Sequence, residues 1–370
     1  MNRPVVVTGG GTGGHIFPMQ AIAEALMERG VASADLRYVG STRGQEGRLL
    51  GGGPIALTLL PGRGLRRSLS PQAWRQNLGA ITGLVRAATT GVLLVGRWRP
   101  RAVVSVGGYA SFAVSLGAVL WRRPLILVDL DAHAPLTHRL LRRWASRRCV
   151  AFGTSDARTV VTGAPVRADI AAIDRSSEAR TRAKLTLNPP IAPERRVVVV
   201  MTGSLGSRRV NELVVSLAGL WAERSDITLV HVTGRRDEAW VREKAPTTNG
   251  LDYRIIAFAD MTLWWAIADV AVCRAGATTV AELSTLGIAA LLVPLPGAPG
   301  DHQGANAQAL ATAGGAMVFP ESSLTPTKLA AALTLVLDPE QQLRMEIAAR
   351  SLSKRDAALA IADATLEVAR

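Results

Sequence analysis

The chain has 370 residues, 48% of them hydrophobic and only 4% aromatic, and a formal net charge of +14. A chain of this length is longer than a typical domain with a single hydrophobic core, and its length and composition suit two α/β domains. The two cysteines, Cys149 and Cys273, lie far apart, which excludes a disulfide framework or Cys-rich metal site and favours a reducing cytoplasm. We expect neither a signal peptide nor a membrane span, because the apolar stretches are short or interrupted by Arg and Gly.

The excess positive charge lies entirely in the first half. Residues 1–165 carry 21 Arg, no Lys and 7 acidic residues, whereas residues 166–370 carry 22 basic and 22 acidic residues. Codon preference would explain Arg in place of Lys but not this asymmetry. Arg binds phosphate through a planar fork, so nucleic acid, an anionic membrane or a phosphorylated substrate would fit. With three Tyr and five Phe, the chain lacks the aromatic surface of a nucleic-acid binder, and we expect no nucleic-acid partner.

Strands alternate with helices along the whole chain. In the first half, a helix is predicted at residues 16–29, and strands are predicted at residues 4–7, 35–39, 102–106, 124–128, 150–152 and 159–162. In the second half, helices are predicted at residues 209–221 and about 339–370, and strands at residues 195–201, 228–232, 253–257, 270–273 and 289–293. This alternation predicts two parallel sheets with sites at the carboxyl ends of their strands. We place one domain at residues 1–164 and a second at 165–349, with a helix at about 350–370 that packs back on the first.

Glycine turns follow three predicted strands, at residues 9–14, 107–108 and 203–206. Backbone N–H groups in such turns can bind a diphosphate. His15 stands where the first turn meets its helix, whose dipole disfavours a protonated ring, so His15 is a candidate general base. An isolated histidine there would more often cap or pack the turn, but the glycines favour a functional role. The first turn is not a dinucleotide fingerprint, because no acidic residue ends the next strand.

The most specific stretch is CRAGATTVAEL at residues 273–283, followed by DHQGANA at residues 301–307. Within the first, residues 276–279 (Gly-Ala-Thr-Thr) end a strand and open a helix, which is a natural phosphate-binding site. Glu282 presents two acceptor oxygens to ribose hydroxyls. Gln303 and Asn306 are spaced to share one helix face, where amides can bind sugar hydroxyls. The alternative for Glu282 is an acid that merely stabilises the start of its helix.

With these two motifs, the chain resembles the MurG family of N-acetylglucosaminyltransferases over essentially its whole length. The resemblance also rests on GGGTGGHIFPMQAIAEAL (residues 9–26), VGGYASF (106–112), TGAPVR (162–167) and TGSLGS (202–207). It implies a GT-B fold, in which two Rossmann-like domains flank an interdomain cleft. It also implies inverting transfer of GlcNAc from UDP-GlcNAc to the C4 hydroxyl of the muramyl sugar of lipid I, with no cofactor and no required metal.

The resemblance assigns roles to particular residues. His15 would be the general base for the accepting hydroxyl. UDP-GlcNAc would be bound in the second domain by Arg167, Ser204, Ile256, Phe258, Ala277, Thr278, Glu282, His302, Gln303 and Asn306. The diphosphate of lipid I would meet Thr12, Gly13, Gly14, Gly107, Gly108, Tyr109 and Asp131 in the first domain.

A basic and apolar segment is the candidate membrane contact. Eight arginines surround the apolar helix residues Leu84, Val85, Val92, Leu93 and Leu94; they are Arg63, Arg66, Arg67, Arg75, Arg86, Arg97, Arg99 and Arg101. A basic rim around an apolar face is typical of peripheral attachment to an anionic leaflet, although the apolar residues alone would suit a helix that covers a sheet. We expect the protein at the cytoplasmic face of the plasma membrane.

Three departures from the family pattern affect the acceptor more than the fold. The family's His-Glu-Gln-Asn is Val-Asp-Leu-Asp here (residues 128–131), its Gln after Gly-Gly-Ser is Leu205, and its Asn in Thr-Gly-Asn-Pro is Ala164. Asp129 or Asp131 could act as a base, or His133 could restore polarity. Two alternatives therefore stay open: a related transferase with another acceptor, and a non-catalytic membrane-associated protein that binds nucleotide sugars.

Overall fold

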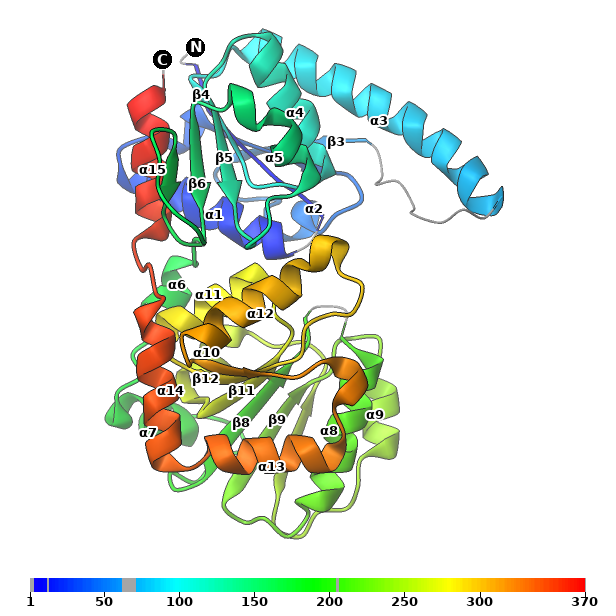
Figure 1. Ribbon diagram of the computed structural model, residues 1–370, viewed down its shortest axis with the longest axis vertical. Coiled ribbons are helices and arrows are strands. Elements are labelled where there is room, and N and C mark those ends of the chain that lie inside the picture. The colour runs from blue at the N-terminus through cyan, green and yellow to red at the C-terminus, as the bar shows by residue number, and fades with distance from the viewer. Residues whose placement is uncertain (1–2, 12, 62–70, 204–205, 370) are drawn as a thin grey trace. The chain divides into compact units, whose positions relative to one another are not determined.

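The structure is a computed structural model that describes residues 3–11, 13–61, 71–203 and 206–369, without the side chains of residues 71–82, 84 and 299. It divides the chain into two compact units (Figure 1). The first comprises Met1–Arg167 and Lys354–Arg370, and the second comprises Ala168–Ser353. The sequence places these two boundaries three and four residues earlier.

The first unit contains a seven-stranded sheet in the order β3-β2-β1-β4-β5-β6-β7, in which every pair is parallel. Its strands are β1 (Val5–Thr8), β2 (Leu36–Ser41), β3 (Ala56–Leu60), β4 (Ala102–Ser105), β5 (Leu125–Asp129), β6 (Arg147–Val150) and β7 (Thr159–Val161). Its helices are α1 (Gly13–Glu28), α2 (Glu46–Leu49), α3 (Pro71–Trp98), α4 (Tyr109–Leu120), α5 (Leu136–Leu141) and α15 (Ala357–Val368), with 3-10 turns η1 (Ser33–Asp35) and η2 (Arg142–Trp144).

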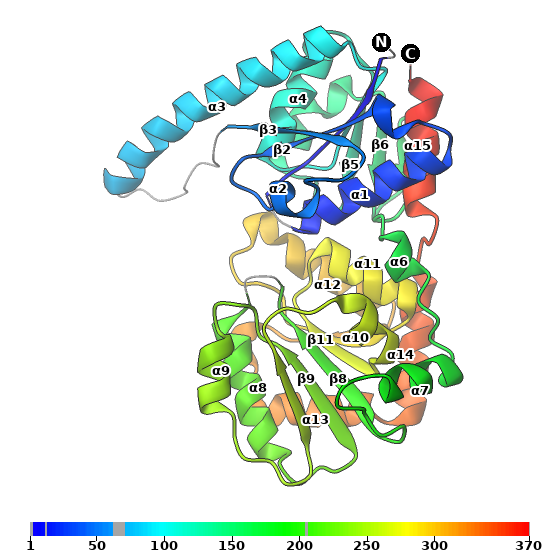
Figure 2. The ribbon, with the colours of Figure 1, turned by 180° about the vertical axis from the view of Figure 1, so that it is seen from behind.

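Helices cover both faces of this sheet. Helices α1 and α15 pack together on one face, whereas α3, α4 and α5 form a layer on the other (Figures 1 and 2). Strands buried on both faces are apolar runs such as Val5–Val7, which are almost completely buried. Ion pairs Arg29–Asp363 and Arg147–Glu367, both 2.6 Å, link α15 to the rest of the unit.

The second unit contains a six-stranded parallel sheet in the order β10-β9-β8-β11-β12-β13. Its strands are β8 (Arg196–Met201), β9 (Ile227–Val232), β10 (Asp252–Ile256), β11 (Val270–Cys273), β12 (Ala289–Leu292) and β13 (Ala316–Val318). Its helices are α6 (Ala168–Ala171), α7 (Ser177–Leu185), α8 (Arg208–Leu220), α9 (Glu238–Lys244), α10 (Met261–Ile267), α11 (Ala277–Leu286), α12 (His302–Thr312), α13 (Pro326–Val336) and α14 (Pro339–Ser351), with 3-10 turns η3 (Pro299–Asp301) and η4 (Glu321–Ser323). The two parallel sheets confirm the predicted class of two Rossmann-like domains.

Three predictions about elements need correction. The single last helix at residues 339–370 is wrong, because α14 and α15 are separate helices on either side of the unit boundary. The break falls at residues 352–356, in a polar run whose Ser and Asp residues favour helix ends. Strand β6 begins at Arg147 instead of residue 150, because two arginines at its start hide the apolar pattern. Strands β3 and β13 were not predicted from the sequence.

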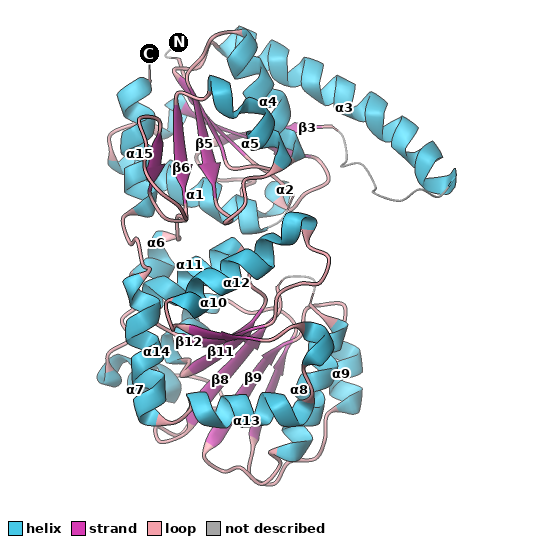
Figure 3. Cartoon of the chain, in the orientation of Figure 1, coloured by secondary structure: helices cyan, strands magenta, loops and turns pink. Residues whose placement is uncertain are grey.

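Each sheet has one point at which the strand order reverses direction. This point lies between β1 and β4 in the first unit. In the second unit it lies between β8 and β11, which are neighbours in the sheet (Figure 3). Ligands of open parallel sheets bind at the carboxyl ends of the strands beside such a switch point. The chain segments that leave these four strands are therefore the first places to look for a site. In the part of the chain that the structure describes, no helix is long and apolar enough to span a membrane.

Candidate functional site

Two glycine turns lie side by side at the switch point of the first unit. Thr8 and Ser105, the last residues of β1 and β4, are paired in the sheet, so the turns that follow them start together. Gly108 has a φ of +90°, and a Cβ on it would lie 2.7 Å from the carbonyl oxygen of Gly10. Only glycine therefore allows the two turns to approach this closely.

His15 lies in the first turn of α1 and faces the second glycine turn. A Cβ on Gly107 would be 3.4 Å from His15 Nε2, so the ring packs against the backbone there. Gly13 and Gly14 open α1, and Tyr109 opens α4, where its hydroxyl is hydrogen-bonded to Ser41 Oγ. The structure thus gathers six predicted residues at one switch point: Gly13, Gly14, His15, Gly107, Gly108 and Tyr109. Thr12 lies outside the described residues.

A buried carboxylate completes the first turn. Glu46 Oε1 accepts hydrogen bonds from the backbone N–H groups of Gly11 (2.9 Å) and Ser41 (3.1 Å), and the residue is fully buried. The N–H of Gly11 is therefore already bonded within the protein. Sequence reasoning missed Glu46, although an acid between Gly44 and Gly47 was a usable signal.

Asp129 is the last residue of β5, whereas Asp131 lies beyond the strand, and their surroundings differ. Asp129 is buried, accepts a 2.7 Å hydrogen bond from His138 Nδ1, and lies 3.2 Å from an Arg148 nitrogen. Burial alone would raise the pKa of Asp129, but these two partners outweigh it and hold the pKa below its ordinary value. A carboxylate held in this way is a weak base, which argues against Asp129 as the catalytic base. Asp131 is half-buried in the loop beyond β5.

Helix α11 starts at the switch point of the second unit, directly after β11. Gly276 caps it, and Ala277 and Thr278 are its first two residues, both half-buried. The first N–H groups of a helix have no intrahelical partner and favour an anion. In the loop that follows the neighbouring strand β8, Gly206 has a φ of +73°, and a Cβ on it would lie 2.2 Å from the Thr233 carbonyl oxygen. Ser204 and Leu205, directly before Gly206, lie outside the described residues.

Arg274 ties the surrounding loops together. Its buried guanidinium donates to Ser207 Oγ (2.7 Å) and to the carbonyl oxygens of Val293 (3.0 Å) and Pro294 (3.1 Å), and it pairs with Glu321. It thereby connects the loops that follow β8, β11 and β12. The sequence signal for this role was a charged residue set directly after a buried apolar strand.

Glu282 lies on the second turn of α11 and is half-buried. Its Oε2 accepts a 2.9 Å hydrogen bond from the indole N–H of Trp265, a fully buried residue of α10. Sequence reasoning missed Trp265. The structure therefore places the predicted ribose-binding acid beside the helix start that holds Ala277 and Thr278.

The amides of α12 are already engaged with the backbone of neighbouring loops. Asn306 is 0% exposed and donates from Nδ2 to the carbonyl oxygen of Ala275 (3.2 Å), just before α11. Gln303 Oε1 accepts from the backbone N–H of Leu295 (2.9 Å), and His302 is the half-buried first residue of α12. Asn306 thus holds the turn at the start of α11.

The remaining predicted donor residues lie at two other places. Ile256 ends β10, and its carbonyl oxygen accepts from the backbone N–H of Thr233 (2.9 Å). Phe258 is 46% exposed, and the guanidinium of Arg235 lies 5.2 Å from its ring centroid. Arg167 is the last residue of the first unit's main segment, with its guanidinium 4.8 Å from the Phe17 ring centroid.

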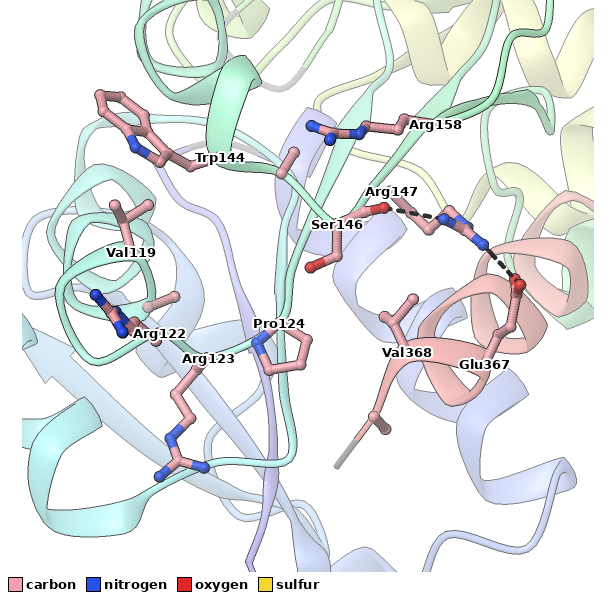
Figure 4. Close-up of a pocket in the computed structure, with 13 residues that line it drawn as sticks. Val119, Arg122, Arg123, Pro124, Trp144, Ser146, Arg147, Arg158, Glu367 and Val368 are labelled. Atoms are coloured by element: carbon pink, nitrogen blue, oxygen red, sulfur yellow. Dashed lines mark hydrogen bonds and ion pairs between the residues drawn. The ribbon is translucent and has the colours of Figure 1, made fainter.

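A pocket of about 590 Å³ lies at the amino ends of β5 and β6, at the end of the first sheet away from the glycine turns (Figure 4). Its lining includes Arg122, Arg123, Trp144 and Arg158, and Arg147 reaches across to Glu367. None of the residues singled out from the sequence lines it. Within the described residues, no three His, Cys, Asp or Glu side chains gather as a metal site would require.

Comparison with known proteins adds a family. Residues 5–150 match the glycosyltransferase family 28 N-terminal domain, and residues 197–361 match the C-terminal domain of that family. A protein of Alkalilimnicola ehrlichii is 38% identical over 374 residues, covering 100% of both chains, and one of Syntrophotalea carbinolica is 34% identical over 96% of each. Both are named UDP-N-acetylglucosamine–N-acetylmuramyl-(pentapeptide) pyrophosphoryl-undecaprenol N-acetylglucosamine transferase.

Solved structures agree in fold. The crystal structure of Acinetobacter baumannii MurG superposes with a TM-score of 0.77 at 26% identity, covering 99% of this chain and 100% of that one. A UDP-GlcNAc 2-epimerase from Neisseria meningitidis, solved with UDP-GlcNAc, superposes with a TM-score of 0.67 at 12% identity over 98% of this chain and 100% of that one. The latter likeness concerns the fold alone.

Proposed function

The chain belongs to the MurG family of glycosyltransferases, and from this we propose that it transfers GlcNAc from UDP-GlcNAc to the C4 hydroxyl of the muramyl sugar of lipid I, forming lipid II. The observation that carries the proposal is the start of α11 at Ala277 and Thr278, with Glu282 on the following turn, at the switch point of the second sheet. It is supported by the match over the full length of the chain to a protein named as an N-acetylglucosamine transferase of this kind.

The donor is proposed to bind in the second unit. Its diphosphate meets the amides of Ala277 and Thr278, where the helix dipole stabilises the charge that develops on departing UDP. Glu282 accepts hydrogen bonds from the ribose hydroxyls, because a carboxylate offers two acceptor oxygens. Phe258 and the backbone after Ile256 flank the uracil. Ser204, Arg167, His302 and Gln303 complete the proposed contacts, and Asn306 acts through the turn that it holds.

The acceptor is proposed to bind in the first unit. Its diphosphate meets Thr12, Gly13 and Gly14 and the second turn at residues 107–109, with Asp131 nearby. His15 takes the proton of the C4 hydroxyl while that oxygen attacks the anomeric carbon. The new C–O bond forms as the bond to UDP breaks on the opposite side, so the configuration inverts.

The layer of α3, α4 and α5 is proposed to contact an anionic membrane surface. Residues 47–128 and 132–155 contain no Asp or Glu, so this whole layer is free of acids. Exposed apolar side chains lie on it beside exposed arginines; they are Val85, Leu93, Leu136, Leu140 and Trp144, with Arg86, Arg97, Arg139, Arg142 and Arg143.

On α3, the exposed stripe follows a four-residue spacing from Val85 through Leu93 to Arg97. On η2, the guanidinium of Arg143 lies 3.8 Å from the centroid of a Trp144 ring. Each basic residue near an anionic leaflet contributes about 1 kcal/mol. Arg63, Arg66 and Arg67 lie outside the described residues, as do the side chains of Arg75 and Leu84. We infer peripheral attachment at the cytoplasmic face of the plasma membrane.

One assay tests the reaction. The protein is incubated with radiolabelled UDP-GlcNAc and a short-chain lipid I, and label is expected in a lipid product together with an equal amount of UDP. Glu282→Ala is expected to raise the KM for UDP-GlcNAc while the protein stays folded. Binding of UDP-GlcNAc without transfer would favour a non-catalytic protein, and transfer only to another acceptor would favour a diverged transferase.

A further inference from the structure

We propose that Trp265 is a positioning residue that sets the orientation of the Glu282 carboxylate, and thereby the preference of the donor site for ribose over deoxyribose. The inference rests on the proposed function, since it takes Glu282 as the ribose-binding acid. It begins from the 2.9 Å hydrogen bond between the Trp265 indole N–H and Glu282 Oε2.

The Trp265 side chain has little freedom to move. It is among the largest fully buried side chains in the described residues, at 0% exposure. Its carbonyl oxygen accepts from the guanidinium of Arg175, which also donates to the carbonyl oxygen of Ala268 (2.8 Å) and so secures the end of α10. A buried ring on a secured helix presents its N–H in one fixed direction.

The direction of the hydrogen bond between Trp265 and Glu282 is fixed by the chemistry of the two side chains. An indole N–H can only donate, so once buried it requires an acceptor, and the Glu282 carboxylate supplies it. A hydrogen bond from a fixed donor narrows the range of rotamers of a half-buried Glu, which lowers the entropy cost when a ligand must fix one of them. The indole is neutral and therefore orients the carboxylate without neutralising it. The fixed orientation of the carboxylate therefore raises the affinity for the ligand group that the carboxylate binds.

The matched pair of variants lies within one helix. Trp265→Phe removes the N–H and keeps an aromatic ring. Trp264→Phe makes the same change at the preceding residue, which is also buried but has no hydrogen bond to Glu282 among those described. Calorimetry would measure the Kd of UDP and of 2′-deoxy-UDP for the full chain and both variants.

The wild-type protein and Trp264→Phe are expected to prefer UDP over 2′-deoxy-UDP by about tenfold or more, as hydrogen bonds to a charged group do. In Trp265→Phe this ratio is expected to fall towards one, with 2′-deoxy-UDP binding unchanged. An unchanged ratio, or an equal loss of both affinities, would overturn the inference, because a purely structural role affects both ligands alike. A wild-type protein that shows no preference would instead refute Glu282 as the ribose acid, and the inference with it.

A second measurement does not need that variant to fold. The indole ¹H–¹⁵N resonance of Trp265 can be assigned in the wild-type protein by replacing the other seven Trp residues one at a time. UDP is expected to shift this resonance more than 2′-deoxy-UDP does. Equal shifts with both nucleotides would contradict the proposal.

Discussion

Asp129 and His138 form a buried pair, with 2.7 Å between Oδ1 and Nδ1, at the end of β5. His138 Nε2 lies 3.0 Å from Ser105 Oγ, two residues before Gly107. The pair therefore joins β5 and α5 to the strand that carries the second glycine turn. Asp129, which departs from the family pattern, thus supports the proposed acceptor site through His138 and Ser105.

Asp129→Asn is expected to destabilise the protein by about 3 kcal/mol, because it leaves Arg148 and His138 without their buried anion. The lowered pKa of Asp129 stabilises the fold above the unfolded-state pKa, and this contribution is lost as pH falls through the folded-state value. Urea unfolding at pH 7 and below pH 4 would show the difference shrinking in acid. Glu243→Gln, an exposed acid, is the control, and equal stabilities for the two variants at pH 7 would contradict this reading.

His15→Ala is expected to lower kcat by a factor of about 10² to 10⁴, the usual contribution of a general base. The Kd for UDP-GlcNAc should stay within a few fold, since the donor is proposed to bind in the other unit. Steady-state kinetics with lipid I and calorimetry with the donor separate these two effects. A large rise in the donor Kd with kcat intact would assign His15 to donor binding instead.

Reversing the charge of Arg139 and Arg142 together is expected to weaken binding to vesicles that contain phosphatidylglycerol by more than tenfold at low salt. The difference should disappear at high salt, which screens charges at an exposed surface. Co-sedimentation would measure it. Arg209 and Arg344, exposed on the second unit, give the matched double reversal, and equal losses in the two variants would argue against a dedicated membrane face.

His231 should make the second unit sensitive to acid. Burial lowers the pKa of His231 to about 3. Its ring nitrogens are hydrogen-bonded to Asn211 Oδ1 (3.0 Å) and to the Tyr253 hydroxyl (2.8 Å). The folded state therefore binds fewer protons than the unfolded state between about pH 3 and pH 6.5, so stability falls as pH drops through that window. The loss attributable to His231 is about 3 kcal/mol between pH 7 and pH 4. His231→Gln should flatten this part of the stability curve, and an equally steep curve would reject the explanation.

The sequence predicted the parallel sheets because buried strands and glycine turns leave local patterns. Val5–Val7 and the turn after them are contiguous, and so are β11 and the start of α11. The contacts that support the site are not contiguous. Trp265 and Glu282 are 17 residues apart, and Glu46 and Gly11 are 35 apart, so only the folded chain brings each pair together. The break between α14 and α15 was missed because the polar run at residues 352–356 is a weak local signal, which a helical pattern on both sides of it obscures.

A crystal structure with UDP is the most direct test of the donor site on which the account depends. We predict the diphosphate within hydrogen-bond distance of the backbone N–H groups of Ala277 and Thr278, and the ribose hydroxyls on the carboxylate of Glu282. Nucleotide bound at the glycine turns of the first unit, or anywhere else away from α11, would contradict it.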